Sequence, residues 1–281
     1  MDNTLEFPDL LRLIDDRSAA FRAAVASAPS LEVQVPTCPE WTLSDLVQHL
    51  GQGRRRWAAV VVAGPSTVDP ASRATQGIGT SEETASVKAE PPGREALDAW
   101  LAASTQALLD ALRQAGPDRR CWTWWDTSQS PQTCGAVARH QLQEISVHTY
   151  DAQLSVGAAQ PLPDEVALDG VEDFLSTCVA TTTAWPHDPA VVDYHATEGR
   201  SWRLWLSGDG ARFARLPEPV STGSTAAGED RVPAGDAAYA SARGTAAELV
   251  MAFYGRSPME ALEVDGDRRV FDQLIAWEPE E

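Results

Sequence analysis

Three residues in the stretch QEISVHTYDAQ have the types and spacing that metal or acid–base chemistry requires. Glu144, His148 and Asp151 are separated by four and then three positions, so an α-helix places them along one stripe. Apolar neighbours such as Ile145 are typical of a helix that packs against a core. A carboxylate and an imidazole on an inward face are costly to bury unless something pairs with them. A metal ion is one such partner, and a hydrogen-bonded core cluster is the alternative.

Imidazole nitrogens and a carboxylate suit zinc or a similar first-row divalent metal. His49 is the best third ligand, because it lies three residues after Leu46 on the inward side of a predicted helix. Three protein ligands would leave coordination positions open, as in catalytic zinc sites. His140, eight residues before His148, is a reserve ligand. The spacing alone leaves open that His148 is a satisfied core histidine.

Asp151 has two interpretations at this point. Its carboxylate either orients a metal ligand or contacts substrate as a group behind the first ligands. Alternatively it pairs with Arg139 or with another surface cation.

The elements that must position these residues are helices with apolar stripes in the first 156 residues. The second helix follows PTCPEW, where Thr42 is a good N-cap and Asp45, three residues on, completes a capping box. The other three are predicted at 8–28, 94–115 and 132–156. Four amphipathic helices of this length predict an antiparallel four-helix bundle.

Two long connections interrupt the helical half, at 64–93 and 116–131. Loops of this length inside a compact domain are often functional. The second contains Trp122, Trp124 and Trp125. These rings either wall a ligand pocket or plug one end of the bundle, and the sequence favours neither.

The chain after residue 157 reads as a small α+β domain. A linker at 157–165 leads into a predicted helix, extended segments, a loop, a further strand in DAAYASA and two last helices. The helices are expected at 164–184, 244–256 and 268–277, and the extended segments at 190–197, 201–207 and 211–216. The loop is expected at 217–236 and the further strand at 236–242. We therefore expect two domains, residues 1–158 and 159–281.

Composition narrows the functional class. The 281 residues include 41 acidic and 22 basic side chains, for a formal net charge of −19. Such a surface repels nucleic acid and anionic membranes. The sequence has no apolar run long enough to span a membrane and no secretory pattern at its start. Four scattered cysteines without a CxxC pair fit reduced thiols, so we expect a cytoplasmic protein.

Three motifs resemble the mycothiol-dependent maleylpyruvate isomerase family. VPTCPEWTLSDLVQHLGQGRRRW resembles its N-terminal motif PxWxxxDLxxHL, and ARHQLQEISVHTYDA resembles its R…ExxxHxxD helix. GTAAELVMAFYGRSP and the LEVDGDRRVFDQLIAW that follows it resemble its small C-terminal domain. The resemblance implies a multi-domain α+β fold, with a DinB-like four-helix bundle followed by a smaller α+β domain.

The resemblance also implies a ligand set and a cofactor. The family's metal, commonly zinc, is held by a histidine of the second helix and by the Glu and His of the fourth. These positions fall on His49, Glu144 and His148, the residues that spacing selected. Members use mycothiol, a low-molecular-weight thiol, as cofactor or co-substrate.

Further site residues follow from the same motifs. An arginine of the C-terminal domain is expected to face the site as a catalytic group; Arg256 in FYGR is the best match and Arg243 the rival. Asp151, Arg139 and Trp41 lie in the matching motifs and are predicted to bind the cofactor. The family often has Arg directly after the metal-binding histidine. Here that position is Thr149, which we expect to alter substrate choice more than metal chemistry.

Two reaction types fit a metal-activated thiol. In an isomerase the thiolate adds to a conjugated double bond, allows rotation and leaves; in an S-transferase it attacks an electrophilic carbon and stays attached. The expected partners are therefore a small-molecule thiol and a small electrophile. The alternatives are a non-catalytic protein that senses or binds a thiol or metal, and a structural site in which the metal only pins two helices. The sequence does not decide between monomer and homodimer.

Overall fold

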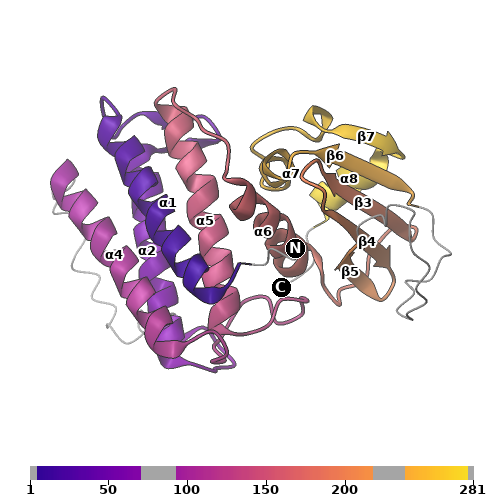
Figure 1. The fold of residues 1–281 in the computed structure, drawn as a ribbon, viewed down its shortest axis with the longest axis horizontal. Coiled ribbons are helices and arrows are strands. Elements are labelled where there is room, and N and C mark those ends of the chain that lie inside the picture. The colour runs from indigo at the N-terminus through magenta and orange to yellow at the C-terminus, as the bar shows by residue number, and fades with distance from the viewer. Residues whose placement is uncertain (1–4, 71–92, 218–237, 278–281) are drawn as a thin grey trace, which may run out of the picture. The chain divides into compact units, whose positions relative to one another are not determined.

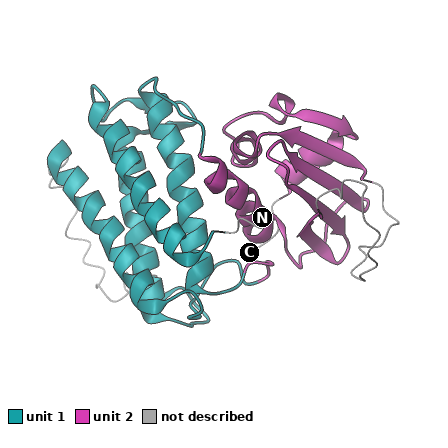
Figure 2. Cartoon of the chain, viewed as in Figure 1, with its two compact units in different colours: residues 1–126, 131–162 teal, residues 127–130, 163–281 magenta. Residues whose placement is uncertain are grey.

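The computed structural model describes residues 5–70, 93–217 and 238–277. The chain forms two compact units (Figure 2). Unit 1 comprises residues 1–126 and 131–162, and unit 2 comprises residues 127–130 and 163–281. The predicted domain boundary at 158/159 stays a prediction. Most of the connections expected at 64–93 and 217–236 lies outside the described residues.

Four long helices of unit 1 lie side by side (Figure 1). The packing pairs α1 with α5 and α2 with α4. Their bounds lie within two residues of the helices expected from the apolar stripes. They are α1 (Phe7–Ser27), α2 (Leu43–Ala63), α4 (Arg94–Ala115) and α5 (Cys134–Ser155).

Local signals fix the start of α2. The Oγ1 of Thr42 accepts a hydrogen bond from the Asp45 amide at 3.2 Å, and the Asp45 carboxylate accepts one from the Thr42 amide at 2.9 Å. The predicted capping box is thus confirmed. Because it sets the first turn, it also fixes which face of α2 carries His49.

The helix α5 is the most enclosed element of unit 1. Fourteen of its 22 residues are buried, so several of its polar side chains must lie inside the unit. Polar groups in such a place need partners. This explains why the chemistry-bearing stretch of the sequence looked like a core helix.

A short hairpin precedes α2 and was not expected from the sequence. Strands β1 (Gln34–Val35) and β2 (Cys38–Thr42) pair antiparallel, with Gln34 opposite Thr42. The stretch VPTCPEW contains two prolines, which cannot donate hydrogen bonds to a strand ladder. The Gln34 side chain supplies donors instead, reaching the carbonyl oxygen of Trp41 at 2.9 Å. The hairpin thereby fixes Thr37 and Trp41 beside the helices.

Unit 2 is built on a five-stranded mixed sheet with strand order β5-β4-β3-β6-β7. The β3–β6 pair is parallel and the other pairs are antiparallel. The edge strand β7 was not predicted. The strands are β3 (Ala190–Ala196), β4 (Ser201–Ser207), β5 (Gly210–Arg215), β6 (Ala240–Gly244) and β7 (Glu263–Gly266).

The helices of unit 2 are α6 (Asp164–Phe174), α7 (Ala246–Phe253) and α8 (Arg269–Ala276). After Phe174, α6 continues as one π-helical turn over Leu175–Val179. The helix expected over 164–184 ends there, because Thr181 pairs its backbone with Ala211 of β5. The α+β fold class is confirmed. None of the described helices is long and apolar enough to cross a membrane.

Candidate metal centre

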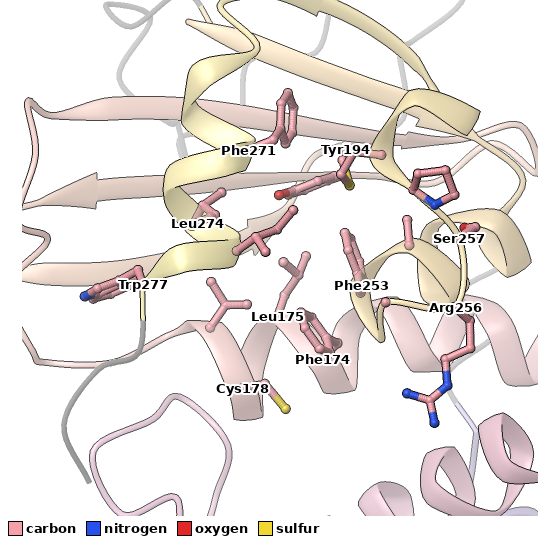
Figure 3. A pocket seen from close by; sticks show the side chains of 16 residues that line it. Phe174, Leu175, Cys178, Tyr194, Phe253, Arg256, Ser257, Phe271, Leu274 and Trp277 are labelled. Carbon is pink, nitrogen blue, oxygen red and sulfur yellow. The ribbon is translucent and has the colours of Figure 1, made fainter. Parts of the chain in front are cut away.

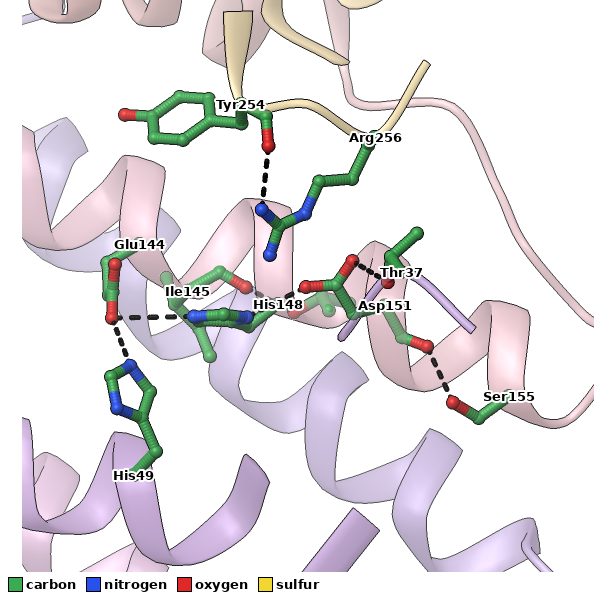
Figure 4. A network of polar contacts seen from close by, with 10 residues as sticks. Thr37, His49, Glu144, Ile145, His148, Asp151, Ser155, Tyr254 and Arg256 are labelled. Atoms are coloured by element: carbon green, nitrogen blue, oxygen red, sulfur yellow. Dashed lines mark hydrogen bonds and ion pairs between the residues drawn. The ribbon is translucent and has the colours of Figure 1, made fainter. Parts of the chain in front are cut away.

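Three side chains from two helices converge in unit 1 (Figure 4). His49 comes from α2, whereas Glu144 and His148 come from successive turns of α5. The Nε2 of His49 donates to Oε1 of Glu144 at 2.9 Å, and Nε2 of His148 lies 3.5 Å from the same oxygen. Each residue offers one ligand atom, and these atoms lie within 4.8 Å of one another.

The donor set and its spacing fit a divalent metal. Zinc ligands lie about 2.0–2.2 Å from the ion, so neighbouring ligand atoms of a tetrahedral site are about 3.3 Å apart. The distances of 2.9 and 3.5 Å bracket that value. Among the described residues, no fourth histidine, cysteine or carboxylate belongs to the group. The arrangement therefore matches a site with three protein ligands and open positions.

His148 is oriented from behind by a buried carboxylate. Its Nδ1 donates to Oδ2 of Asp151 at 2.8 Å, and the Asp151 side chain has no solvent exposure. The other oxygen of Asp151 accepts a hydrogen bond from Thr37 of the hairpin at 2.6 Å. A carboxylate behind a histidine fixes the ring orientation and raises its basicity as a ligand. Of the two interpretations of Asp151, this geometry supports the orienting one.

The ion pairs shift the pKa values of both α5 residues. Burial lowers the pKa of His148, but hydrogen bonds to Asp151 and Glu144 outweigh burial and raise it to about 9. Burial raises the pKa of Glu144, but hydrogen bonds from His148 and His49 outweigh it, and the pKa falls well below its ordinary value. Glu144 is therefore an anion at neutral pH, which suits a cation ligand.

Trp41 lies against the two imidazoles. Its ring centroid is 4.7 Å from that of His49 and 6.3 Å from that of His148. The side chain is half-buried on β2, directly before the capping box of α2. Trp41 thus forms an aromatic wall beside the three residues. Its predicted part in cofactor binding stays a prediction.

The predicted arginines are placed as follows. Arg139 is half-buried on α5, five residues before Glu144. Arg256 belongs to unit 2, where its Nη1 donates to the carbonyl oxygen of Tyr254 at 2.7 Å. Arg243 is exposed on β6. The predicted roles of Arg139 and Arg256 in the site stay predictions.

The sequence interpretation missed Arg54, which is buried on α2. Its guanidinium donates to Ser18 at 2.9 Å and to Thr105, which ties α2 to α1 and α4. Burial lowers its pKa to about 10, against the raising effect of Glu144 and Asp15. The signal was present in the pattern, because Arg54 occupies the apolar stripe four residues after Leu50.

Thr37 was missed for a different reason. It donates a hydrogen bond to Asp151, which lies 114 positions further along the sequence, and no local pattern predicts that pairing.

His140, the predicted reserve ligand, does not belong to the three-residue group and packs against tryptophans instead. Its ring packs 5.7 Å from that of Trp124 and 5.2 Å from that of Trp125. Trp125 is buried and lies 5.5 Å from Trp57 of α2. This cluster supports the interpretation in which tryptophans of the 116–131 loop plug the helical unit.

Comparison with known proteins agrees with the resemblance seen in the motifs. Residues 11–153 match the mycothiol maleylpyruvate isomerase N-terminal domain, and residues 165–273 match the C-terminal domain of the same family. No curated protein sequence matches the chain. Among solved structures, a mutant of mycothiol-dependent maleylpyruvate isomerase is similar, with a TM-score of 0.52 and 13% identity over 93% of each chain. That likeness supports the fold. Because the two domain matches together span most of its residues, the chain belongs to the mycothiol maleylpyruvate isomerase family.

Proposed function

We propose that this protein is a metal-dependent enzyme that uses mycothiol to isomerise a small unsaturated acid of the maleylpyruvate type. The convergence of His49, Glu144 and His148 on one point is the observation that carries the proposal. The family and the isomerase of similar fold supply the thiol and the reaction class. Zinc is the metal that the two imidazoles and one carboxylate suit best.

The protein's own residues would divide the work as follows. His49, Glu144 and His148 hold the metal, which when bound favours the thiolate form of a thiol. Asp151 keeps the His148 ring in a fixed orientation. Trp41 covers one side of the two imidazoles.

Substrate carboxylates need a cation, since charge accumulates on the substrate when a thiolate adds to a conjugated double bond. We assign this role to Arg256 of unit 2. We further propose that Asp151, Arg139 and Trp41 contribute to mycothiol binding. For Asp151 that contribution is indirect, through His148, because its carboxylate is buried.

The decisive experiment measures metal content and turnover in the same preparations. We would purify His49→Ala, Glu144→Gln and His148→Ala together with the parent, and determine bound metal by mass spectrometry. Isomerisation of maleylpyruvate would be followed with and without mycothiol. His187→Ala is the control, because His187 is exposed in unit 2 and outside the three-residue group.

The proposal expects about one metal ion per chain in the parent and in the control, and strong loss of metal in the three variants. Activity should require both the metal and mycothiol. Full isomerisation by a metal-free variant would exclude this mechanism. Accumulation of a stable thioether product would instead identify an S-transferase. Thiol binding without turnover across a panel of electrophiles would identify a non-catalytic binding protein.

A further inference from the structure

A cavity lies within unit 2. Its volume is about 620 Å³, inside the range of about 300–1,000 Å³ that is usual for small-molecule sites. Strand β3, helix α6, the π-helical turn and helices α7 and α8 all contribute to it (Figure 3). All of its lining residues belong to unit 2, and none of them is among the three candidate metal ligands.

The wall of the cavity is aromatic. The ring of Tyr194 on β3 lies edge-on to Phe253 of α7, with centroids 5.0 Å apart, and 6.2 Å from Phe271 of α8. Phe253 in turn stacks on Phe174 of α6 at 4.9 Å. Trp277 follows α8 and completes the lining. Such a wall favours a flat, apolar ligand.

The π-helical turn contributes to the same wall. Leu175, Cys178 and Val179 line the cavity from this turn. A π-helical turn interrupts the regular ladder of α6, and such turns occur frequently at functional sites. Here it coincides with the cavity.

One polar group is directed into this apolar space. The Tyr194 side chain is 4% exposed, and its hydroxyl makes no hydrogen bond with any residue that the structure describes. Its hydroxyl end points between Phe271 and Leu274 (Figure 3). Burial also raises the pKa of this phenol, so it stays protonated and can donate. A ligand oxygen that accepts a hydrogen bond from this hydroxyl would therefore be favoured over a purely apolar ligand.

The charge of the lining selects against ions. None of the described lining residues is acidic, and the only cation among them is Arg256. Its guanidinium extends away from the ring cluster (Figure 3). It donates to the carbonyl oxygen of Tyr254 (Figure 4). The aromatic interior therefore offers no partner for a charged group, and burying an unpaired charge is strongly unfavourable.

We propose that this cavity is a binding site for an uncharged aromatic or alicyclic molecule that carries one hydroxyl or carbonyl oxygen, which hydrogen-bonds to Tyr194. The rings of Phe253 and Phe271 contact the apolar body of the ligand. This site requires neither the metal nor mycothiol, so it stands or falls independently of the proposed isomerase activity.

Three probes of equal ring size test the chemistry. Equilibrium dialysis of the full-length protein would give dissociation constants for 2-naphthol, naphthalene and 2-naphthoate at neutral pH. We expect 2-naphthol to bind most tightly, naphthalene about threefold to tenfold more weakly for want of the hydrogen bond, and the charged 2-naphthoate most weakly. Tyr194→Phe should remove the preference for naphthol over naphthalene while leaving naphthalene binding unchanged.

A pair of variants on α8 tests the location. Leu274→Glu places a carboxylate in the cavity and should weaken naphthol binding at least about tenfold. Ala276→Glu adds the same charge on the same helix at an exposed position outside the lining, and should bind naphthol as the parent does. Thermal melting of each variant confirms folding.

Three results would overturn the proposal. They are absence of naphthol binding by the parent, tighter binding of naphthoate than of naphthol, and a naphthol preference that survives in Tyr194→Phe. The last comparison remains decisive even if Leu274→Glu fails to fold.

Discussion

Asp151 and His148 form a buried pair in which the imidazole Nδ1 donates to the carboxylate at 2.8 Å. The pairing commits the Nδ1 side of the ring to Asp151. The opposite nitrogen, Nε2, is therefore the one that faces Glu144, at 3.5 Å. A single hydrogen bond thus selects which atom of His148 is offered to a metal.

Replacing this carboxylate should weaken the metal site without removing a ligand. Asp151→Asn keeps the shape but loses the charge and one of the two oxygens that accept hydrogen bonds from His148 and Thr37. We expect metal affinity to fall by about 10- to 100-fold, the usual effect of removing such a partner. Competition with a chromophoric chelator would measure it. Asp110→Asn, an exposed carboxylate paired with Arg113, is the matched control, and equal losses in both variants would refute the orienting role.

We expect Arg54 to contribute strongly to the stability of unit 1. Arg54→Ala leaves a cavity and deprives Ser18 and Thr105 of their donor, so we expect the free energy of unfolding to drop by about 2–4 kcal/mol. The neighbouring Arg55 is exposed and donates to Ser104 at 2.9 Å, and Arg55→Ala should cost less than about 1 kcal/mol. Urea unfolding of both variants gives the comparison. Similar losses would show that burial of Arg54 is unimportant.

Much of the helical unit was predictable because its signals are local. The apolar stripes placed all four long helices, and TLSD marked the start of α2 through the Thr42–Asp45 capping box. The candidate metal ligands followed from helical geometry, since Glu144 and His148 are one turn apart and His49 lies on the inward stripe of α2.

Pairings between segments that are distant in the sequence could not be predicted from local patterns. Thr37 reaches Asp151 only because a two-stranded hairpin forms across two prolines. The strand β7 exists through its pairing with β6, as when Ala242 lies opposite Val264, and its own four residues carry no alternating pattern. The helix expected to run to 184 ends at 179 for the same reason, because its continuation pairs with β5.

Gly210 lies at another contact between distant segments, because its backbone closely approaches that of Thr181. Substitution at this position should therefore have a large effect on stability. It begins β5 with φ of +111°, and a Cβ there would lie 2.1 Å from the carbonyl oxygen of Thr181. Gly210→Ala therefore combines backbone strain with a clash against another backbone, and should cost at least about 2 kcal/mol.

Gly208 provides the control, because a Cβ there would meet no atom within 4 Å. Gly208→Ala should change the melting temperature little. If thermal melting shows equal effects for the two substitutions, the close approach of Thr181 to Gly210 does not hold in solution.

The raised pKa of His148 gives the metal-free protein a defined pH dependence. The folded-state pKa of about 9 lies above the ordinary 6.5, so protonated His148 stabilises the fold. That stabilisation is fully present below about pH 6.5 and is lost as the pH rises through about 9. We expect the melting temperature of the metal-free protein to fall across this window, and to fall less in Asp151→Asn.

The same proton competes with the metal. A ligand nitrogen must be unprotonated, so binding at neutral pH expels the proton from Nε2 of His148. Each pH unit below about 9 then weakens the apparent zinc affinity about tenfold, and affinity should rise about tenfold between about pH 7 and pH 8. Calorimetry of zinc binding in buffers of different ionisation enthalpy counts the protons released. Asp151→Asn lowers the pKa of His148, so it should release fewer protons at neutral pH than the parent. If zinc binds the parent at neutral pH without releasing a proton, then either His148 is not a ligand or its pKa is not raised.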